Sequence, residues 1–493
     1  PASLTLQQAF AGGGHTLSVA GPGRVSLAGG AAGLASIVQD MGSELRLGDG
    51  KSIISSGAQI YSGVVKGLNA TLASTALNAI AATGSGNDFT GTLHVTAGDT
   101  TLSDSNALSV VLDTGATKLT AGQALAVSGT AASLVTDSEA LVFGDTRVTG
   151  NGSFTARGAV SQLAGQALQV DGATTVDAIG QTVSLTEAGN KFDGLVTLKA
   201  GKTNLYASEN LNVLLNQTGD TTLGTDKALT LGGTAANLVT DSAVLTFGAT
   251  RVTGNGSFTV RGAVSQLAGQ ALQVDGATTV DATGQTVSLT EAANTFGGLV
   301  TVKAGQTDLR ARDSLNVSLD QTGATTLTAG DMLTLGGTAA SLATDSAALT
   351  FGTTQVTGGG SFTARGAVSQ LAGQALQVGG ATTFDAGSEA LSLTEAGNTF
   401  GGLVTVKAGQ TALRARDSLN VSLDQTGATT LTAGDALTLG GTAASLVTDS
   451  AALTFGVTRV TGDGRFTARG AVSQLAGQAL NVGGTTTFDA GSE

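Results

Sequence analysis

The sequence predicts an all-β fold, a β-solenoid whose turns hold roughly 20 residues each. Three observations predict it: a strict internal repeat, a composition of 74 Gly with only two Pro, and short runs of alternating apolar and polar residues. Gly supplies turns with positive φ, and scarce Pro leaves backbone N–H groups free for a hydrogen-bond ladder. In the alternating runs, successive side chains face opposite sides of a strand.

The repeat is most visible in the phrase RGAVSQLAGQAL, which opens at four arginines spaced by 104 residues: Arg157, Arg261, Arg365 and Arg469. Apolar residues keep the same spacing, and we expect them to form a repeated core. They are Leu125, Leu229, Leu333 and Leu437; Phe143, Phe247, Phe351 and Phe455; and Phe192, Phe296 and Phe400. A looser copy places Phe89 before Phe192 at a spacing of 103.

Each repeat holds several short predicted strands. In the last copies they are ALSL at 390–393, LVTV at 403–406, SLNV at 418–421, ALTL at 436–439, ALTF at 452–455 and ALNV at 479–482. Gly, Asp, Asn and Ser separate them, as turns require. Five turns of roughly 20 residues would account for one repeat. The competing fold is a string of separate β-sandwiches, which usually have longer strands and a core aromatic such as Trp.

Two regions are predicted within one continuous rod. Residues 1–85 do not follow the 104-residue period, but SLTL, TLSV and RVSL alternate in the same way, so degenerate solenoid turns are expected there. Residues 86–493 are predicted to be tandem 104-residue repeats, the last copy being truncated.

Composition excludes several classes of function. The net charge is −13, with a pI of about 4.5, whereas nucleic-acid binding needs a basic surface. No stretch approaches the ~18 apolar residues of a membrane helix. The chain has no Cys, so neither disulfides nor Cys metal sites are available.

The phrases AVSQLAGQALNVGGTTTFDAGSE and GNTFGGLVTVKAGQTALRARDSLNVSL carry a resemblance over about residues 85–493. They resemble the repeats of filamentous haemagglutinin-like exoproteins, large surface proteins of Gram-negative bacteria that are often exported by two-partner secretion. The family's phrases correspond to Asn398, Phe400, Gly402 and Val404, then Leu413 and Leu419, then Ala471 to Gln474 and Ala479 to Ala490.

The resemblance implies a right-handed parallel β-helix that is secreted or held at the cell surface. It also implies an outer-membrane transporter as export partner, and a role in adhesion, aggregation, biofilm formation or toxin display. The family's NPNG- and NPNL-like secretion motifs are absent from residues 1–85.

Candidate residues for chemistry are few. The two histidines, His15 and His94, lie far from other ligand types, so neither a metal nor a cofactor is expected. Aspartates recur in the phrase TDS, and their two readings are calcium ligation and, favoured here, a turn aspartate capping its own backbone. They are Asp137, Asp241, Asp345 and Asp449. The arginines of RGAVSQ are candidate receptor contacts or charges that keep a face hydrated.

The function predicted from these features is that of an adhesin-like structural rod, secreted or on the bacterial surface, and not an enzyme. Its expected partners are a receptor on a host or neighbouring cell, or other copies of itself. Alternatives are a self-assembling extracellular filament or sheath and, less favoured, a carbohydrate-active β-helix enzyme, which would need clustered carboxylates in one cleft.

Overall fold

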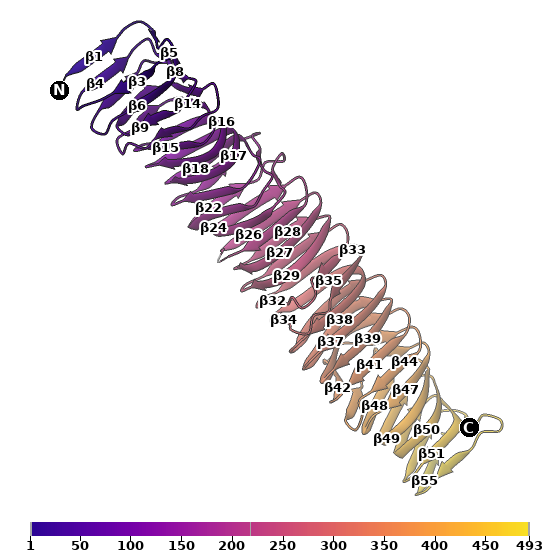
Figure 1. Cartoon of the computed structure of the whole chain (residues 1–493). Coiled ribbons are helices and arrows are strands. Elements are labelled where there is room, and N and C mark those ends of the chain that lie inside the picture. The colour runs from indigo at the N-terminus through magenta and orange to yellow at the C-terminus, as the bar shows by residue number, and fades with distance from the viewer. Residues whose placement is uncertain (1, 217, 492–493) are drawn as a thin grey trace. The chain divides into compact units, whose positions relative to one another are not determined.

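The computed structural model describes residues 2–216 and 218–491, apart from the side chain of Gln425. Over these residues the strands pair in parallel, turn upon turn, and no described residue is helical. The predicted fold class is confirmed: the chain is an all-β parallel solenoid with tandem repeats (Figure 1). No helix among the described residues has the length and apolarity to span a membrane.

Two compact units make up the chain, Pro1–Ala243 and Val244–Glu493. Residues 2–85 form solenoid turns within the first unit.

The first unit begins with three-sided turns. One side is a five-stranded side sheet of β1 (Ser3–Leu6), β4 (Arg24–Leu27), β7 (Glu44–Leu47), β10 (Val64–Leu68) and β13 (Asp88–Thr90). A second side contains β2 (Phe10–Ala11), β5 (Ala31–Leu34), β8 (Ser52–Ser55), β11 (Thr71–Ser74) and β14 (Thr92–Ala97). The third contains β3 (Thr16–Val19), β6 (Ser36–Gln39), β9 (Gln59–Tyr61), β12 (Ile80–Ala82) and β15 (Thr100–Asp104).

Longer strands, which bend from one side to the next, build the rest of the first unit. They are β16 (Leu108–Ala121), β17 (Ala124–Ser138), β18 (Ala140–Val148), β22 (Thr174–Leu185) and β24 (Leu195–Ala207). Shorter strands complete the turns: β19 (Gly152–Ala156), β20 (Val160–Gln162), β21 (Leu168–Val170), β23 (Lys191–Phe192), β25 (Leu211–Leu215), β26 (Asp220–Thr225), β27 (Ala228–Ala235) and β28 (Leu238–Ser242).

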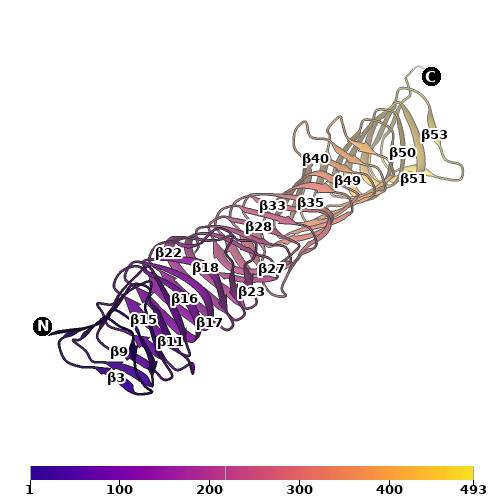
Figure 2. The same cartoon turned by 90° about the horizontal axis from the view of Figure 1, so that it is seen from above.

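The strands of the second unit are stacked turn upon turn (Figure 2). Their pairing register forms two main columns of strands, here called sheets P and Q. Sheet P contains β31 (Val264–Gln266), β37 (Ala324–Ala329), β39 (Ser341–Ser346), β41 (Gly360–Ala364), β44 (Thr382–Asp385), β47 (Leu403–Lys407) and β53 (Val472–Gln474). Sheet Q contains β30 (Gly256–Val260), β36 (Leu315–Gln321), β42 (Val368–Gln370), β45 (Ala390–Leu393), β48 (Gln410–Ala415), β52 (Gly464–Ala468) and β55 (Thr486–Asp489).

Other strands of this unit pass between sheets or form short side sheets. The strands that bend are β29 (Val244–Val252), β33 (Thr278–Leu289), β35 (Leu299–Ala311), β38 (Met332–Ala339), β40 (Ala348–Val356), β49 (Leu419–Ala433), β50 (Ala436–Ser450) and β51 (Ala452–Val460). The strands that lie wholly in side sheets are β32 (Leu272–Val274), β34 (Thr295–Phe296), β43 (Leu376–Val378), β46 (Thr399–Phe400) and β54 (Leu480–Val482).

One 104-residue repeat spans five and a half turns, so the prediction of five turns is wrong. The column of paired residues that starts at Gly256 in sheet Q reaches Phe351, whereas the equivalent of Gly256 in the next copy, Gly360, lies in sheet P. The Gly256 column returns to an equivalent strand only at β52, eleven turns and two copies later.

The prediction failed because it gave each turn roughly 20 residues, whereas many turns are shorter. A short turn brings Leu333 to Leu349, whereas a longer one separates Val264 from its partner Val287. Equivalent residues of successive copies therefore lie on opposite main sheets, and they return to the same sheet only after two copies.

The expected core residues all point into the solenoid. Phe351 of the Q column and Phe362 of sheet P meet edge to face, with ring centroids 4.9 Å apart. Such geometry adds about 0.5–1.5 kcal/mol to the burial of apolar area. The eleven are at most 6% exposed: Leu125, Leu229, Leu333, Leu437, Phe143, Phe247, Phe351, Phe455, Phe192, Phe296 and Phe400.

One bend recurs in four copies of the repeat and contains a glycine with φ above 90°. At Gly337 φ is 97°, and an added Cβ would lie 2.0 Å from the carbonyl oxygen of Leu319, one turn away. Its neighbour Gly336 differs, because a Cβ there would lie 3.2 Å from the nearest atom, the carbonyl oxygen of Thr353. The same bend recurs at Gly129, Gly233 and Gly441, with φ of 93°, 94° and 91°.

Replacing Gly337 by Ala is expected to destabilise the local turns by at least about 2 kcal/mol, because both the backbone conformation and the close approach exclude a side chain. Urea unfolding followed by circular dichroism measures this. Gly336→Ala is the matched control and is expected to change the midpoint little. Equal losses in the two variants would contradict the explanation.

Candidate functional site

The repeated arginines contact the TDS aspartates one turn away. Arg157 Nη1 lies 2.7 Å from Asp137 Oδ1, and the equivalent distance is 2.7 Å for Arg365 to Asp345. The pair Arg469–Asp449 lies at 2.9 Å. The favoured prediction that these aspartates cap their own backbone is thus corrected: at these three places they accept from an arginine of the next turn.

These ion pairs remain at the surface, with arginine side chains 53–59% exposed. Pairs of this kind contribute little to stability, about 0–1 kcal/mol each. Arg261 occupies the equivalent place in its copy. Among the described residues no group of three or more His, Cys, Asp and Glu side chains could hold a metal ion.

Beneath the phrase SQLAGQ a buried asparagine pairs with a half-buried glutamine. The side chains of Gln370 and Asn398 exchange two hydrogen bonds, Nε2 to Oδ1 at 2.7 Å and Nδ2 to Oε1 at 2.9 Å. Asn398 Oδ1 also accepts the backbone N–H of Leu376 at 2.8 Å. Gln162–Asn190 and Gln266–Asn294 form the same arrangement.

The amide pair fixes a surface turn with leucine at its exposed corner. Gln374 N–H donates to the carbonyl of Leu371 at 3.1 Å, and Gly373 between them has φ of 73°, as a type II turn requires. The leucine at this position is about half exposed in every copy. These corner leucines are Leu163 (54%), Leu267 (48%), Leu371 (48%) and Leu475 (49%).

Because one repeat spans five and a half turns, the corner leucines of the second unit alternate between the sheet P side and the sheet Q side. Leu267 and Leu475 follow strands of the sheet P column, whereas Leu371 follows β42 of sheet Q. Leu267 and Leu475 are eleven turns apart, which corresponds to about 53 Å at the usual strand spacing.

Removal of the buried amide at Asn398 is expected to loosen the loop that carries Leu371. Asn398→Ala leaves Leu376 N–H and the Gln370 amide without their partner, at a cost of about 2–3 kcal/mol. Thermal unfolding and amide exchange of residues 371–376 measure the effect. Asn420→Ala, at an exposed strand position, is the control, and the idea fails if it changes both readouts equally.

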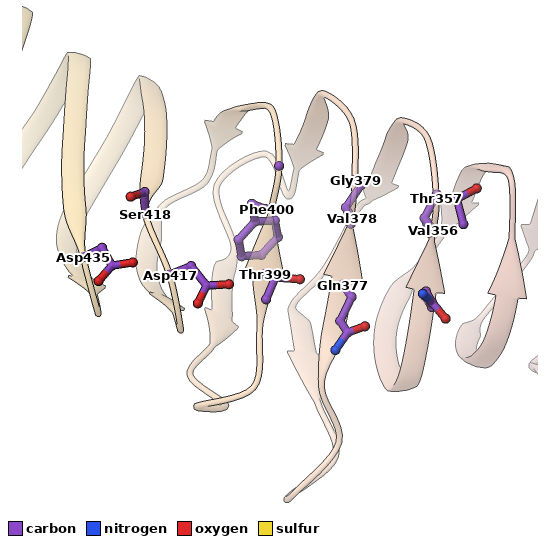
Figure 3. Close-up of a pocket in the computed structure, with 12 residues that line it drawn as sticks. Val356, Thr357, Gln377, Val378, Gly379, Thr399, Phe400, Asp417, Ser418 and Asp435 are labelled. Atoms are coloured by element: carbon purple, nitrogen blue, oxygen red, sulfur yellow. The ribbon is translucent and has the colours of Figure 1, made fainter.

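Each side sheet ends within the solenoid and leaves a step at the corner between the main sheets, here called a ledge. β46 is the last strand of its side sheet, and the following turn passes from one main sheet to the other at Asp417–Ser418 without a side strand. A cavity of about 600 Å³ lies there, with Val378 and Phe400 on its wall. Figure 3 shows Gln377, Thr399, Asp417 and Asp435 in one row along this cavity, one from each successive turn.

An equivalent ledge follows Phe296, with a cavity of about 480 Å³ lined by Gln273, Thr295, Asp313 and Asp331. A third, in the first unit, follows Phe89 and has about 560 Å³. There Asn106 and Gln123 lie in place of the two aspartates. The ledge is therefore a regular product of the repeat, and its charge differs between copies.

The two acidic ledges carry negative charge at neutral pH. Arg416 donates to both carboxylate oxygens of Asp417, at 3.1 and 3.0 Å, and this hydrogen bonding holds the pKa of that carboxyl below its ordinary value. Arg312 acts in the same way on Asp313. Among the described residues no cation lies within ion-pair distance of Asp435 or Asp331. With amide, hydroxyl and carboxylate groups in one row, the ledge is equipped to bind polar or cationic groups.

The family described as Repeats of unknown function (DUF5649) matches residues 129–199, 233–303, 337–407 and 440–493. These matches cover more than half of the chain, which therefore belongs to this family. The first three begin at the positive-φ glycines Gly129, Gly233 and Gly337, and they include the side sheet, the amide pair and the exposed leucine. No curated protein and no solved structure matches the chain.

Sequence reasoning did not single out the corner leucines or the ledge. The leucines lie within the repeated phrase RGAVSQLAGQAL. Their position before Ala-Gly, outside the strand alternation, was a usable signal for an exposed turn. The row from Gln377 to Asp435 had no such signal, because its members are far apart in the sequence and unevenly spaced, and only the register aligns them.

Proposed function

We propose that this chain is part of an adhesin-like structural rod, secreted or displayed on a bacterial surface, that attaches by many weak contacts. One observation carries the proposal: a half-exposed leucine on a braced turn recurs in four copies along the solenoid. Identical weak contacts on a stiff scaffold add up to strong attachment through avidity.

Support also comes from how the leucines are held. A half-exposed leucine on a flexible loop would lose conformational entropy on binding, whereas the Gln–Asn amide pair orders these turns beforehand. The resemblance to filamentous haemagglutinin-like repeats agrees with a role in attachment, aggregation or biofilm formation at the cell surface, and with export through an outer-membrane transporter.

A self-assembling filament or sheath is the second candidate, and the alternate facing of the corner leucines favours it. Contacts on both sheet P and sheet Q sides allow one rod to join two neighbours. The receptor in that case is another copy of the same chain.

Beads coated with the purified chain test the proposal. They are expected to adhere to epithelial monolayers and to one another under shear. Replacing Leu163, Leu267, Leu371 and Leu475 together by Ser is expected to reduce adherence at least about fivefold, since avidity multiplies the loss of each contact.

The matched control replaces three leucines that are exposed to a similar degree but lie on the strands themselves: Leu195 (40%), Leu299 (44%) and Leu403 (43%). These variants are expected to adhere normally. Beads that never adhere more than uncoated ones would refute attachment, and equal losses in both sets would refute the role of the turns. Loss of bead aggregation alone would favour the filament.

A further inference from the structure

The last strand of each internal side sheet has an open edge. β46 pairs with β43 through Gln377↔Thr399 and Val378↔Phe400, and no other described strand pairs with it. In a parallel ladder, alternate residues direct their N–H and C=O groups to the two neighbouring strands. Gly401 N–H donates to Val378 at 2.8 Å, so Thr399 and Gly401 face β43. The N–H and C=O of Phe400 therefore face the ledge.

The first ledge confirms this direction and shows how it can be closed. There the N–H of Phe89 donates to Asp104 Oδ2 at 2.7 Å, and Asp104 Oδ1 accepts the N–H of Asn106. Asp104 is only 4% exposed, and burial raises the pKa of its carboxyl above the ordinary value. The chain itself thus supplies an acceptor for the edge N–H at this ledge.

Later ledges lack that acceptor. The residue equivalent to Asp104 is Ala207, Ala311 or Ala415, each at most 2% exposed, and a methyl group cannot accept a hydrogen bond. Phe296 and Phe400 line the cavities of their ledges. Their edge N–H groups are therefore available to a ligand that supplies the missing acceptor.

The geometry of the ledge defines the ligand. A strand added to the open edge of β46 would continue two columns of side chains. One is the inward column Val356, Val378 and Phe400, and the other is the outward row that ends in Asp417 and Asp435. An occupant in register therefore needs an apolar side chain facing inward, preceded by an outward side chain beside the two carboxylates. Arg416 already pairs with Asp417, so charge complementarity with Asp435 makes that outward side chain basic.

We propose that the ledges at Phe296 and Phe400 bind a short extended peptide segment with a basic residue followed by an apolar one, by addition of a parallel strand. The ledge at Phe89 does not bind it, because Asp104 occupies the edge N–H. The ledge at Phe192 lacks the acidic pair, since Glu209 and Lys227 stand at the positions of Asp417 and Asp435. This inference is independent of the adhesive role proposed above.

Hydrogen–deuterium exchange resolved by peptide tests it on the intact chain, with acetyl-Lys-Val-Gly-amide as probe. This tripeptide copies Gln377-Val378-Gly379 with Lys in place of Gln. Without probe, the amides of Phe296 and Phe400 are expected to exchange at least about tenfold faster than that of Phe89. The probe is expected to slow exchange at Phe296 and Phe400 and to leave Phe89 unchanged.

Ala415→Asn supplies a neutral side-chain acceptor where Asp104 stands at the first ledge. It is expected to abolish the probe's effect at Phe400 while the Phe296 ledge of the same molecule still responds. Asp435→Asn, an exposed change that leaves the core intact, is expected to weaken protection at Phe400 at least about threefold at low salt. This second variant decides the question if Ala415→Asn does not fold.

Acetyl-Glu-Val-Gly-amide is the matched probe of opposite charge and is expected to protect neither ledge. The proposal is overturned if the lysine probe changes neither Phe296 nor Phe400. It is also overturned if protection appears equally at Phe89, or if it persists in the variants. Protection by a neutral oligosaccharide but not by the peptide would assign the ledge to a glycan instead.

Discussion

Every feature of this solenoid depends on the parallel pairing of each turn with the next. The pairing keeps inward side chains in columns, so Phe351 and Phe362 meet from opposite sheets at the same height. It also leaves no room beside the backbone at bends such as Gly337, where the Leu319 carbonyl of the neighbouring turn occupies the space of a side chain. Surface features follow the same register, because an outward residue is placed by the turns above and below it.

The number of residues in a turn of the solenoid varies along the sequence. Short turns, such as the one from Leu333 to Leu349, and long ones, such as that from Val264 to Val287, share one set of columns. The differences in length are absorbed at the corners and in the side sheets. Where a side sheet ends, the main sheets continue uninterrupted and a ledge is left at the corner. The polar row beside Phe400 is thus a consequence of how the core closes, not of a separate binding domain.

Much of the fold was predictable because the signals are local. Glycine-bounded alternation identified the strands, and the 104-residue spacing identified the repeated core, including Phe143 and Leu125, which the structure buries completely. The half-turn offset was not predictable, since it depends on the sum of unequal turn lengths.

The surface was harder to predict for a related reason. Asp137 and Arg157 are widely separated in the sequence, and only the register shows that they pair. Asp104 offers a sharper case. Its carboxylate accepts the edge N–H at one ledge, whereas alanine stands at the equivalent positions 207, 311 and 415 and supplies no acceptor.

The half-integer number of turns per repeat has an evolutionary consequence. Unequal recombination between near-identical copies changes a chain by whole repeats. Gain or loss of a single copy would turn everything beyond the crossover to the opposite side, whereas gain or loss of two would preserve the facing. Selection on any one-sided contact would therefore act on the parity of the copy number, and natural length variants that keep such a contact would differ by even numbers of repeats.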